Sequence, residues 1–279
     1  MTRIESTLME KTGSPIRTPV ASQRGPHAVP AGMTAAEWNM RCDLAALYRV
    51  VAHYGWGDLL STHISARVPD DRSKFLINPW GLLFEEVTAA NLIKVDEHGN
   101  VLDETEYKIN PAGYLIHSCV HVGRPEIDCV LHLHTTDGTA VATQKAGLLP
   151  ITQHALVIYD HIAYHDYEGL VLNSAEQKTL LADLGDKRML ILRNHGTLTA
   201  GRTVGEAFTL MYRLERACRM QIAAQKTGQP LTELPQSVID EGIAGGERVF
   251  GAKGPMPGGQ AEWAAMLRKL DLLGIDYRH

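Results

Sequence analysis

The chain has 279 residues, of which 44% are hydrophobic, and its formal net charge is −5. That length suffices for one large domain or two modest ones. The mildly acidic balance argues against a nucleic-acid partner. No apolar run reaches the roughly 18 residues of a membrane-spanning helix, and the N-terminus has no apolar signal segment, so neither a membrane partner nor secretion is predicted.

The four cysteines lie at positions 42, 119, 129 and 218, without C-x-x-C spacing. Scattered thiols with no pairing pattern are typical of a reducing compartment. We therefore predict a cytoplasmic protein with free cysteines.

The N-terminal part divides into a tail and a helix. Residues 1–32 mix Ser, Thr, Pro, Arg and Gly without apolar periodicity, which predicts a flexible tail that is disordered or lies over a neighbouring subunit. A capping box at Thr34–Glu37 then begins a helix. Apolar residues recur at spacings of about three or four between residues 40 and 54, so one face of this helix is buried.

Three short strands and a second helix are predicted next. The strands span about 62–68, 75–78 and 92–95, and tight turns between them favour antiparallel pairing. Pro111 begins a helix that carries His117 and His121 on one face. Because no glutamate is nearby, we interpret this pair as polar residues near an interface rather than as metal ligands.

The segment after this helix carries the strongest signal for chemistry. Residues 129–134 are apolar and β-branched enough for a buried strand, and the Thr-Thr-Asp-Gly sequence after them ends it. His132 and His134 lie two positions apart, so they project from the same face. Paired imidazoles at the end of a core strand suit a divalent cation such as zinc.

A third histidine strengthens this prediction. The apolar run 188–193 is followed by Asn194-His195-Gly196, where glycine permits a positive φ and a turn that presents His195 at the mouth of the sheet. Three neutral histidines with an open fourth position are typical of a catalytic metal site.

Beyond His134 we expect a helix to about residue 145 and a strand over about 151–158. The segment 154–167 is rich in His, Tyr and Asp, which can transfer protons but which a solvated loop also contains.

The C-terminal third begins with a second capping box, Thr203–Glu206, and a long helix through about residue 225. Residues 227–259 contain scattered prolines and a Gly-Pro-Met-Pro-Gly-Gly cluster, which predicts a loose arm rather than a second domain. An amphipathic stretch over 261–273 forms a short helix in this arm. The predicted organisation is thus a tail (1–32), one domain (33–226) and a C-terminal arm (227–279).

Four motifs together resemble the class II aldolase/adducin family. They are His132-Leu-His134-Thr, Leu192-Arg-Asn-His195-Gly, Ile77-Asn-Pro-Trp-Gly81 and Arg124-Pro-Glu-Ile-Asp128, and the match covers about residues 34–225. The resemblance implies one three-layer α/β/α domain around a mainly antiparallel sheet. It also implies a homotetramer with metal sites near the subunit boundaries, and it carries metal ligation over to His132, His134 and His195.

The chain departs from the family's aldolases at two places. Those enzymes have a glutamate, a metal ligand or general base, four residues before the helical histidine, and here that position before His117 is Gly113. Their phosphate-binding turns are built from small residues, whereas His63 and Trp80 stand in the matching stretches. These departures resemble the adducin head, and they predict that sugar phosphates are not substrates.

We therefore predict a metal-dependent, aldolase-like lyase that cleaves or decarboxylates a small, non-phosphorylated hydroxy-carbonyl or hydroxy-carboxylate compound. One divalent ion per chain, zinc first and iron, manganese or cobalt next, would chelate the substrate and stabilise an enediolate-like intermediate. Since Gly113 offers no base, proton transfer is assigned to Tyr159 and His154, which could reach across a subunit boundary. The predicted substrate pocket comprises His63, Asn78, Trp80, Gly81 and Tyr114.

Two alternatives stay open. The first is an adducin-like oligomeric scaffold without catalysis, in which the metal holds the fold together. The second is a non-haem iron oxygenase, since three histidines with open positions also support oxygen chemistry. The identity of the metal, and its response to substrate analogues, would separate these readings.

Overall fold

A sheet of seven strands forms the centre of the described part of the chain, in the order β3-β2-β1-β4-β7-β6-β5. The computed structural model describes residues 28–169, 175–251 and 257–279, so most of the predicted tail lies outside the described residues. Neighbouring strands are antiparallel except β5 and β6, which are parallel. The prediction of a mainly antiparallel sheet is confirmed.

The strands are short, and their register brings histidines together. They are β1 His63–Arg67, β2 Phe75–Ile77, β3 Ile93–Val95, β4 Cys129–Leu133, β5 Ile162–His165, β6 Met189–Leu192 and β7 Gly196–Gly201. His63 on β1 pairs directly with His132 on β4. Side chains of directly paired residues lie on the same face of a sheet, so these two imidazoles are neighbours.

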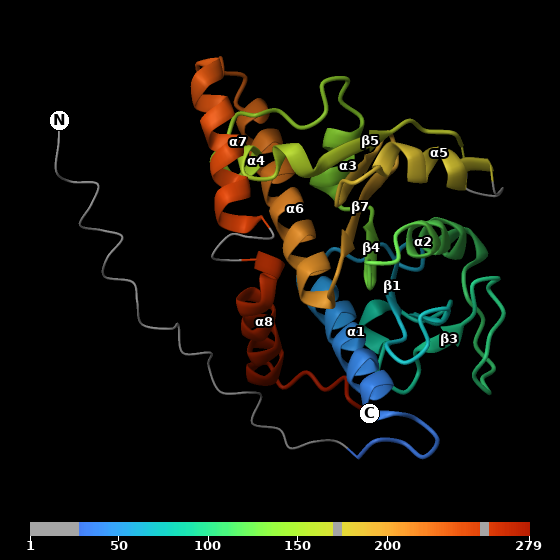
Figure 1. Ribbon diagram of the computed structural model, residues 1–279. Helices are drawn as coiled ribbons and strands as arrows, with labels where there is room; N and C mark the ends of the chain where they lie inside the picture. The colour runs from blue at the N-terminus through green and yellow to red at the C-terminus, as the bar shows by residue number, and fades with distance from the viewer. Residues whose placement is uncertain (1–27, 170–174, 252–256) are drawn as a thin grey trace.

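Helices cover both faces of the sheet, which gives the expected three layers (Figure 1). In Figure 1, α1, α6 and α8 lie on one side and α2 and α5 on the other. The helices are α1 Ala35–His53, α2 Pro111–Gly123, α3 Thr136–Ala142, α4 Gln153–Leu156, α5 Ala175–Leu184, α6 Val204–Lys226, α7 Gln236–Phe250 and α8 Gln260–Leu272, with 3-10 turns η1 Phe84–Glu86, η2 Tyr159–His161 and η3 Pro257–Gly259. No described helix is both long and apolar enough to cross a lipid bilayer.

The alternation of side chains along β4 divides the core between the two faces. Leu131 and Leu133 pack with residues of α1 and α6, such as Leu44. Val130 packs with residues of α2 and α5 on the opposite face. Because His132 is two residues from Val130, it shares the face of α2. The strand therefore turns its histidine toward the layer that also carries the other buried histidines.

Both predicted capping residues begin helices as expected. Thr34 accepts a hydrogen bond from the backbone N–H of Glu37 at 3.1 Å, and α1 starts at the next residue after Thr34. Thr203 accepts one from the N–H of Glu206, also at 3.1 Å, before α6. Each cap satisfies a backbone donor that the first turn leaves unpaired, so these two predictions are confirmed.

The strand predicted over 151–158 is wrong. Thr152 caps the N–H of Ala155, and the chain forms α4 and then η2. The strand lies just after them, as β5, where the backbone of 162–165 pairs with β6. A short apolar run fits a buried helical turn as well as a strand, and here the packing of α4 against α6 and α7 decides for the helix.

The prediction of a loose segment over 227–259 is also wrong, since residues 236–250 form α7. Pro235 precedes this helix rather than breaking it. Its glycines permit close packing: a Cβ at Gly246 would lie 2.6 Å from the backbone of Val157, and one at Gly242 would lie 2.8 Å from Leu156. The last predicted helix, over 261–273, matches α8, which contributes Trp263 to the main core.

Candidate metal centre

Three histidines meet where β4 ends beside the turn between β6 and β7. One ring nitrogen from each of His132, His134 and His195 lies within 4.8 Å of the others. Asn194 holds the left-handed conformation of this turn, with φ +57°, which asparagine tolerates better than most residues. Gly196 does not have the positive φ expected for it. It is required because a Cβ there would lie 2.5 Å from the Leu133 carbonyl oxygen.

Hydrogen bonds fix the tautomers of two of these rings. Nδ1 of His132 donates to the Thr197 carbonyl at 3.1 Å, and Nδ1 of His134 donates to the Asp58 carboxylate at 2.9 Å. A carbonyl and a carboxylate only accept, so both Nδ1 atoms carry a proton, and in the neutral form of each ring Nε2 has a lone pair. These two Nε2 atoms face each other at 3.0 Å. Two lone pairs at that distance repel unless a cation lies between or beside them.

The environment keeps the rings of His132 and His195 neutral. Burial lowers the pKa of His132 well below its ordinary value, and the nearby His195 and His63 lower it further. Burial, then the neighbouring His134, lowers the pKa of His195 to about 4. Neutral imidazole is the form that binds a metal ion. Oriented, neutral rings whose outer nitrogens already have acceptors are also the usual arrangement around a metal, so the donor set fits a divalent cation.

A cavity of about 400 Å³ opens beside the three histidines. That volume suits a small ligand. The other described residues that line it are Ser61, His63, Asn110, Gly113, Ile116, Tyr167, Gly169 and Asn194. Of the predicted substrate residues, His63 is thus at the cavity.

The other predicted substrate residues lie outside this cavity within one chain. The Trp80 side chain is 52% exposed. Asn78 is buried, and its Oδ1 accepts a hydrogen bond from the Tyr48 hydroxyl at 2.8 Å. Gly81, with φ +106°, continues the same turn. Their binding role remains a prediction.

Tyr114 also points away from the histidines. Its ring packs with residues of β2 and β3, and its hydroxyl donates to the backbone carbonyl of Asp96 at 2.5 Å. Burial, then the Asp96 carboxylate, raises the pKa of this hydroxyl above its usual range. Tyr114 therefore supports the fold of the β2–β3 edge in this chain.

The predicted catalytic pair, Tyr159 and His154, likewise lies away from the histidine cavity of its own chain. Tyr159 begins η2, and His154 is an exposed residue of α4. The segment faces α7, where His161 Nε2 lies 3.2 Å from the Glu247 carboxylate. The assignment of proton transfer to Tyr159 and His154 remains a prediction, and it requires that they reach a neighbouring subunit.

Two residues near the centre escaped prediction. Asp58 orients His134 from 76 residues away in the sequence, and no local pattern links them. Tyr167 lies with its ring centroid 6.4 Å from that of His195. Tyr167 is the last residue of the polar segment 154–167, but no pattern in the sequence distinguishes it from the other residues of that segment.

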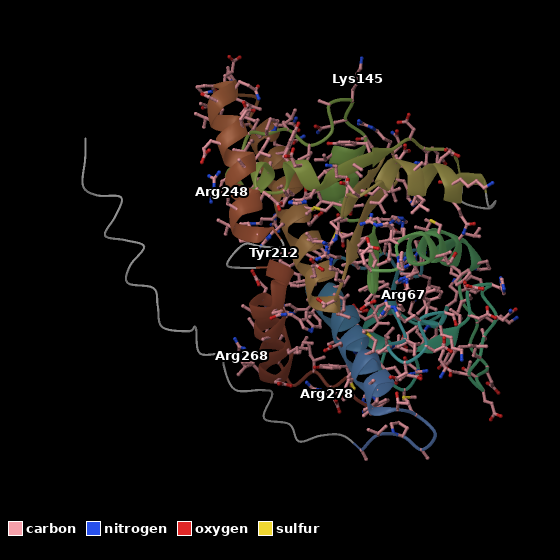
Figure 2. All side chains as sticks on the ribbon, viewed as in Figure 1. Arg67, Lys145, Tyr212, Arg248, Arg268 and Arg278 are labelled. Carbon is pink, nitrogen blue, oxygen red and sulfur yellow. The ribbon has the colours of Figure 1, made fainter. Side chains whose placement is uncertain are left out.

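The helical histidines of α2 lie behind the centre as a buried chain of hydrogen bonds. His117 Nε2 contacts His63 Nδ1 at 3.1 Å, and the Ser65 hydroxyl contacts His117 at 2.6 Å and His121 at 2.7 Å. Arg67 donates to the backbone carbonyl of His121. Figure 2 shows Arg67 within the fold, unlike Arg248 on α7. Both helical histidines are buried, and the group of three possible metal ligands among the described residues does not include them.

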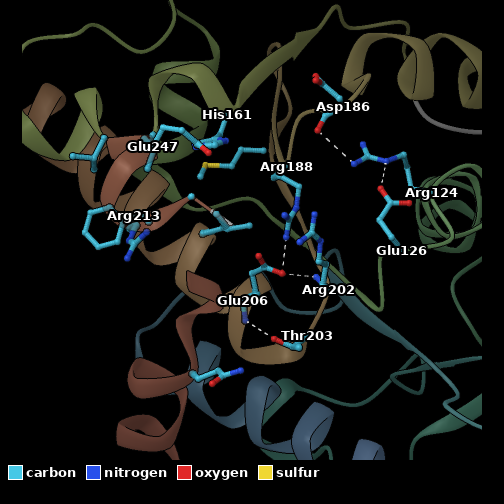
Figure 3. Close-up of a pocket in the computed structure, with 18 residues that line it drawn as sticks. Arg124, Glu126, His161, Asp186, Arg188, Arg202, Thr203, Glu206, Arg213 and Glu247 are labelled. Carbon is cyan, nitrogen blue, oxygen red and sulfur yellow. Dashed lines mark hydrogen bonds and ion pairs between the residues drawn. The ribbon is translucent and has the colours of Figure 1, made fainter. Parts of the chain in front are cut away.

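A second cavity, of about 390 Å³, lies between α7 and the β6–β7 end of the sheet (Figure 3). Its described lining includes four arginines and an equal number of acidic residues. Arg188 pairs with Glu206 at 2.6 Å, and Arg124 with Glu126 at 2.6 Å. We call it the arginine cavity and the first the histidine cavity.

Comparison with known proteins agrees with this architecture. Residues 42–222 match the sequence profile of the Class II Aldolase and Adducin N-terminal domain. The chain belongs to the class II aldolase and adducin family. This confirms the resemblance and the fold expected from it.

Relatives of this chain include both bacterial proteins named for aldolases and animal adducins. A Caulobacter vibrioides protein named for aldolase class 2 is 50% identical over 86% of this chain and 91% of its own length. Mouse alpha-adducin is 37% identical over 92% of this chain, which corresponds to 36% of adducin.

Solved structures show the same fold. A crystal structure of an aldolase II superfamily protein from Pseudomonas syringae has a TM-score of 0.84 and 47% identity, covering 89% of this chain and 98% of that one. The L-fuculose 1-phosphate aldolase of Glaciozyma antarctica has a TM-score of 0.75 and 27% identity, covering 90% and 97%.

Proposed function

We propose that this family member is a metal-dependent, aldolase-like lyase for a small hydroxy-carbonyl or hydroxy-carboxylate compound without a phosphate. The observation that supports it best is the approach of the Nε2 atoms of His132 and His134, 3.0 Å apart at the wall of the histidine cavity. Zinc is the first choice of ion, since three histidines with an open position suit it, and iron, manganese or cobalt come next.

A divalent ion at this position would act as a Lewis acid that polarises a carbonyl or carboxylate oxygen. The chain itself contributes orientation: Thr197 and Asp58 hold the rings of His132 and His134 with Nε2 toward the cavity. His195 completes the set from the β6–β7 turn. Such fixed rings require little reorganisation when a ligand binds.

The lining of the histidine cavity supports a substrate without a phosphate. No Lys or Arg is among the described residues that line it. Proteins usually bind phosphate through such cations or through free backbone amides at helix N-termini. The similar fuculose-phosphate aldolase is named for a phosphorylated substrate, so we expect this chain to differ from it in ligand class.

The test begins with the metal content of the purified protein, which we expect to be about one divalent ion per chain. The metal-loaded protein is then assayed with hydroxy acids, hydroxy-ketones and phosphorylated ketoses. Cleavage or decarboxylation confined to the non-phosphorylated compounds supports the proposal. Robust cleavage of L-fuculose 1-phosphate, or protein that binds no divalent ion, would reject it.

A second candidate is an adducin-like scaffold in which the metal is structural. The 37% identity to alpha-adducin over most of the chain favours it. A filled metal site with no turnover of any compound, and no change in the metal's spectrum on adding them, would select this alternative. Iron in place of zinc would instead direct attention to oxygen chemistry.

We also propose that the protein assembles as a homotetramer and works in the cytoplasm. Apolar side chains such as Leu59, Val238 and Leu272 are exposed on a single chain, and contact between copies would cover them. The four free cysteines accord with a reducing compartment. Light scattering should give four times the chain mass of 30.7 kDa. A monomer at micromolar concentration would contradict the tetramer and any role for Tyr159 across a boundary.

A further inference from the structure

His63 on β1 and Gly113 on α2 share one small volume beside the metal centre. A Cβ at Gly113 would lie 2.3 Å from both Cδ2 and Nε2 of His63, and 2.7 Å from its Cε1. Real side chains do not approach so closely, because atoms in protein interiors are already at contact distance. The His63 ring therefore occupies the space of any side chain at position 113, and only glycine is compatible with it there.

The orientation of the His63 ring follows from its two nitrogens. Nδ1 points into the fold, where it meets Nε2 of His117 at 3.1 Å. Nε2 lies at the Gly113 side, and both residues line the histidine cavity. The ring centroid is 5.5 Å from that of His132. Nε2 of His63 is thus the atom offered to a ligand beside the centre.

Whether that nitrogen donates or accepts depends on Ser65. Its single hydroxyl lies between Nδ1 of His117 and Nε2 of His121, at 2.6 Å and 2.7 Å. A hydroxyl has one proton, so with neutral rings it donates to one histidine and accepts from the other. The hydrogen bonds that link His63, His117, Ser65 and His121 can therefore run in either of two directions. The proton position on His121 decides which direction is taken.

His121 is the last group in this row of hydrogen bonds, farthest from the cavity. Its Nδ1 is buried without a hydrogen-bond partner among the described residues, and Ser65 already contacts its Nε2 at 2.7 Å. The Ile127 backbone, which raises the pKa of this ring, therefore favours a proton on the nitrogen that Ser65 leaves free, Nδ1. Burial lowers the pKa of His121 to about 3, so the ring is neutral. A neutral ring with its proton on Nδ1 accepts at Nε2.

The proton position on His121 fixes the proton positions on Ser65, His117 and His63. Ser65 donates to His121 and accepts from Nδ1 of His117. With its proton on Nδ1, His117 accepts at Nε2 from Nδ1–H of His63. Burial, and then His63 and His121, lower the pKa of His117 well below its ordinary value, so it too is neutral. The lone pair of His63 therefore lies on Nε2, toward the cavity.

We propose that His63 determines which ligands the centre accepts, by taking a hydrogen bond from a ligand hydroxyl on Nε2 while another ligand oxygen binds the ion. Gly113 provides the space for the ring, and His117, Ser65 and His121 set its tautomer. The ligand class is therefore a compound with a hydroxyl next to a carboxylate or carbonyl, rather than its ether. This inference rests on the proposed function.

The test compares two ligands that differ in one hydroxyl proton. The protein is loaded with cobalt(II), and its visible spectrum is followed while glycolate or methoxyacetate is added. In His63→Leu, we expect glycolate affinity to fall by about tenfold, the size of one hydrogen bond, with methoxyacetate affinity unchanged. Ser65→Ala, which interrupts the hydrogen bonds between His117 and His121, should reduce the preference for glycolate in part. An unchanged ratio of the two affinities in His63→Leu would overturn the inference.

Two glycine variants provide a matched control. Gly113→Ala forces the His63 ring to move and should lose the preference for glycolate as His63→Leu does. Gly245→Ala is also within a helix, but its Cβ would meet only Nη2 of Arg248 at 3.6 Å, so it should keep the preference. Wild-type preference in Gly113→Ala would count against the inference. Protein that takes up no cobalt rejects the proposed function as well, whereas cobalt uptake with an unaltered ratio in His63→Leu rejects the inference alone.

Discussion

The histidine cavity and the arginine cavity have nearly the same volume, about 400 and 390 Å³, but opposite chemistry. In the arginine cavity, cations and carboxylates satisfy one another, as Arg124 and Glu126 do (Figure 3). In the histidine cavity, the Nε2 atoms of His132 and His134 face each other at 3.0 Å, and in the neutral rings both carry a lone pair. Buried polar groups are normally paired within the protein. Groups that are oriented but still lack a partner mark a binding site better than cavity size does.

The largest expected difference between the two cavities comes from replacing one histidine in each. His195→Ala should weaken binding of the divalent ion by more than about a hundredfold, beyond the range typical of outer-shell changes. His161→Ala, in the arginine cavity, should leave it unchanged. Competition with a chromogenic chelator measures both. Equal affinities in the two variants would place the ion elsewhere.

A smaller loss of metal affinity is expected from removing the carboxylate that contacts His134, and none from removing the one that contacts His161. Asp58→Ala removes the acceptor of His134 Nδ1–H, so the ring loses its fixed tautomer, and affinity for the ion should fall by about 10- to 100-fold. Glu247→Ala removes the carboxylate beside His161, 3.2 Å away, and serves as the control. If both variants bind as the wild type does, the orienting role of Asp58 is refuted.

The arginine cavity should respond in stability instead. Glu206→Gln leaves the Arg188 guanidinium without its carboxylate in a place where both side chains are only about 15% exposed. We expect the free energy of unfolding to fall by about 1–3 kcal/mol, with no change in metal affinity. Glu241→Gln breaks a pair with Arg248 that is more than half exposed, and it should change stability little. Denaturant titration measures the free energy of unfolding of both variants. Similar losses in Glu206→Gln and Glu241→Gln would contradict the expected difference between a buried and an exposed ion pair.

A further predicted effect is a dependence of the metal-free protein's stability on pH. Burial lowers the pKa of His121 to about 3, whereas in the unfolded chain it is about 6.5. Below pH 6.5 the unfolded state therefore binds a proton that the folded state excludes, and stability falls as the pH falls toward 3. His121→Leu should reduce this slope by up to about 1.4 kcal/mol per pH unit. Replacement of the exposed His98 by Asn should not, and an equal reduction there would disprove the assignment.

Features of short range could be predicted from the sequence. The capping threonines 34 and 203 act on residues three positions away, and the strand geometry at His132 and His134 depends on a two-residue period. The turn at His195 was also predicted, although Asn194 and not Gly196 adopts the positive φ. These patterns are local because backbone geometry sets them. They were enough for the helix starts and for the three histidines.

Only the tertiary structure decided what surrounds those histidines. Asp58 lies 76 residues from His134, and His63 lies 54 residues from His117. No periodicity links such pairs, since strand register and helix packing bring them together. The same reason explains the misplaced strand over 151–158, where packing against α6 and α7 chose a helical turn for an ambiguous run. The sequence by itself determined which three histidines lie near one another, and the fold determined the orientation of their rings and the volume beside them.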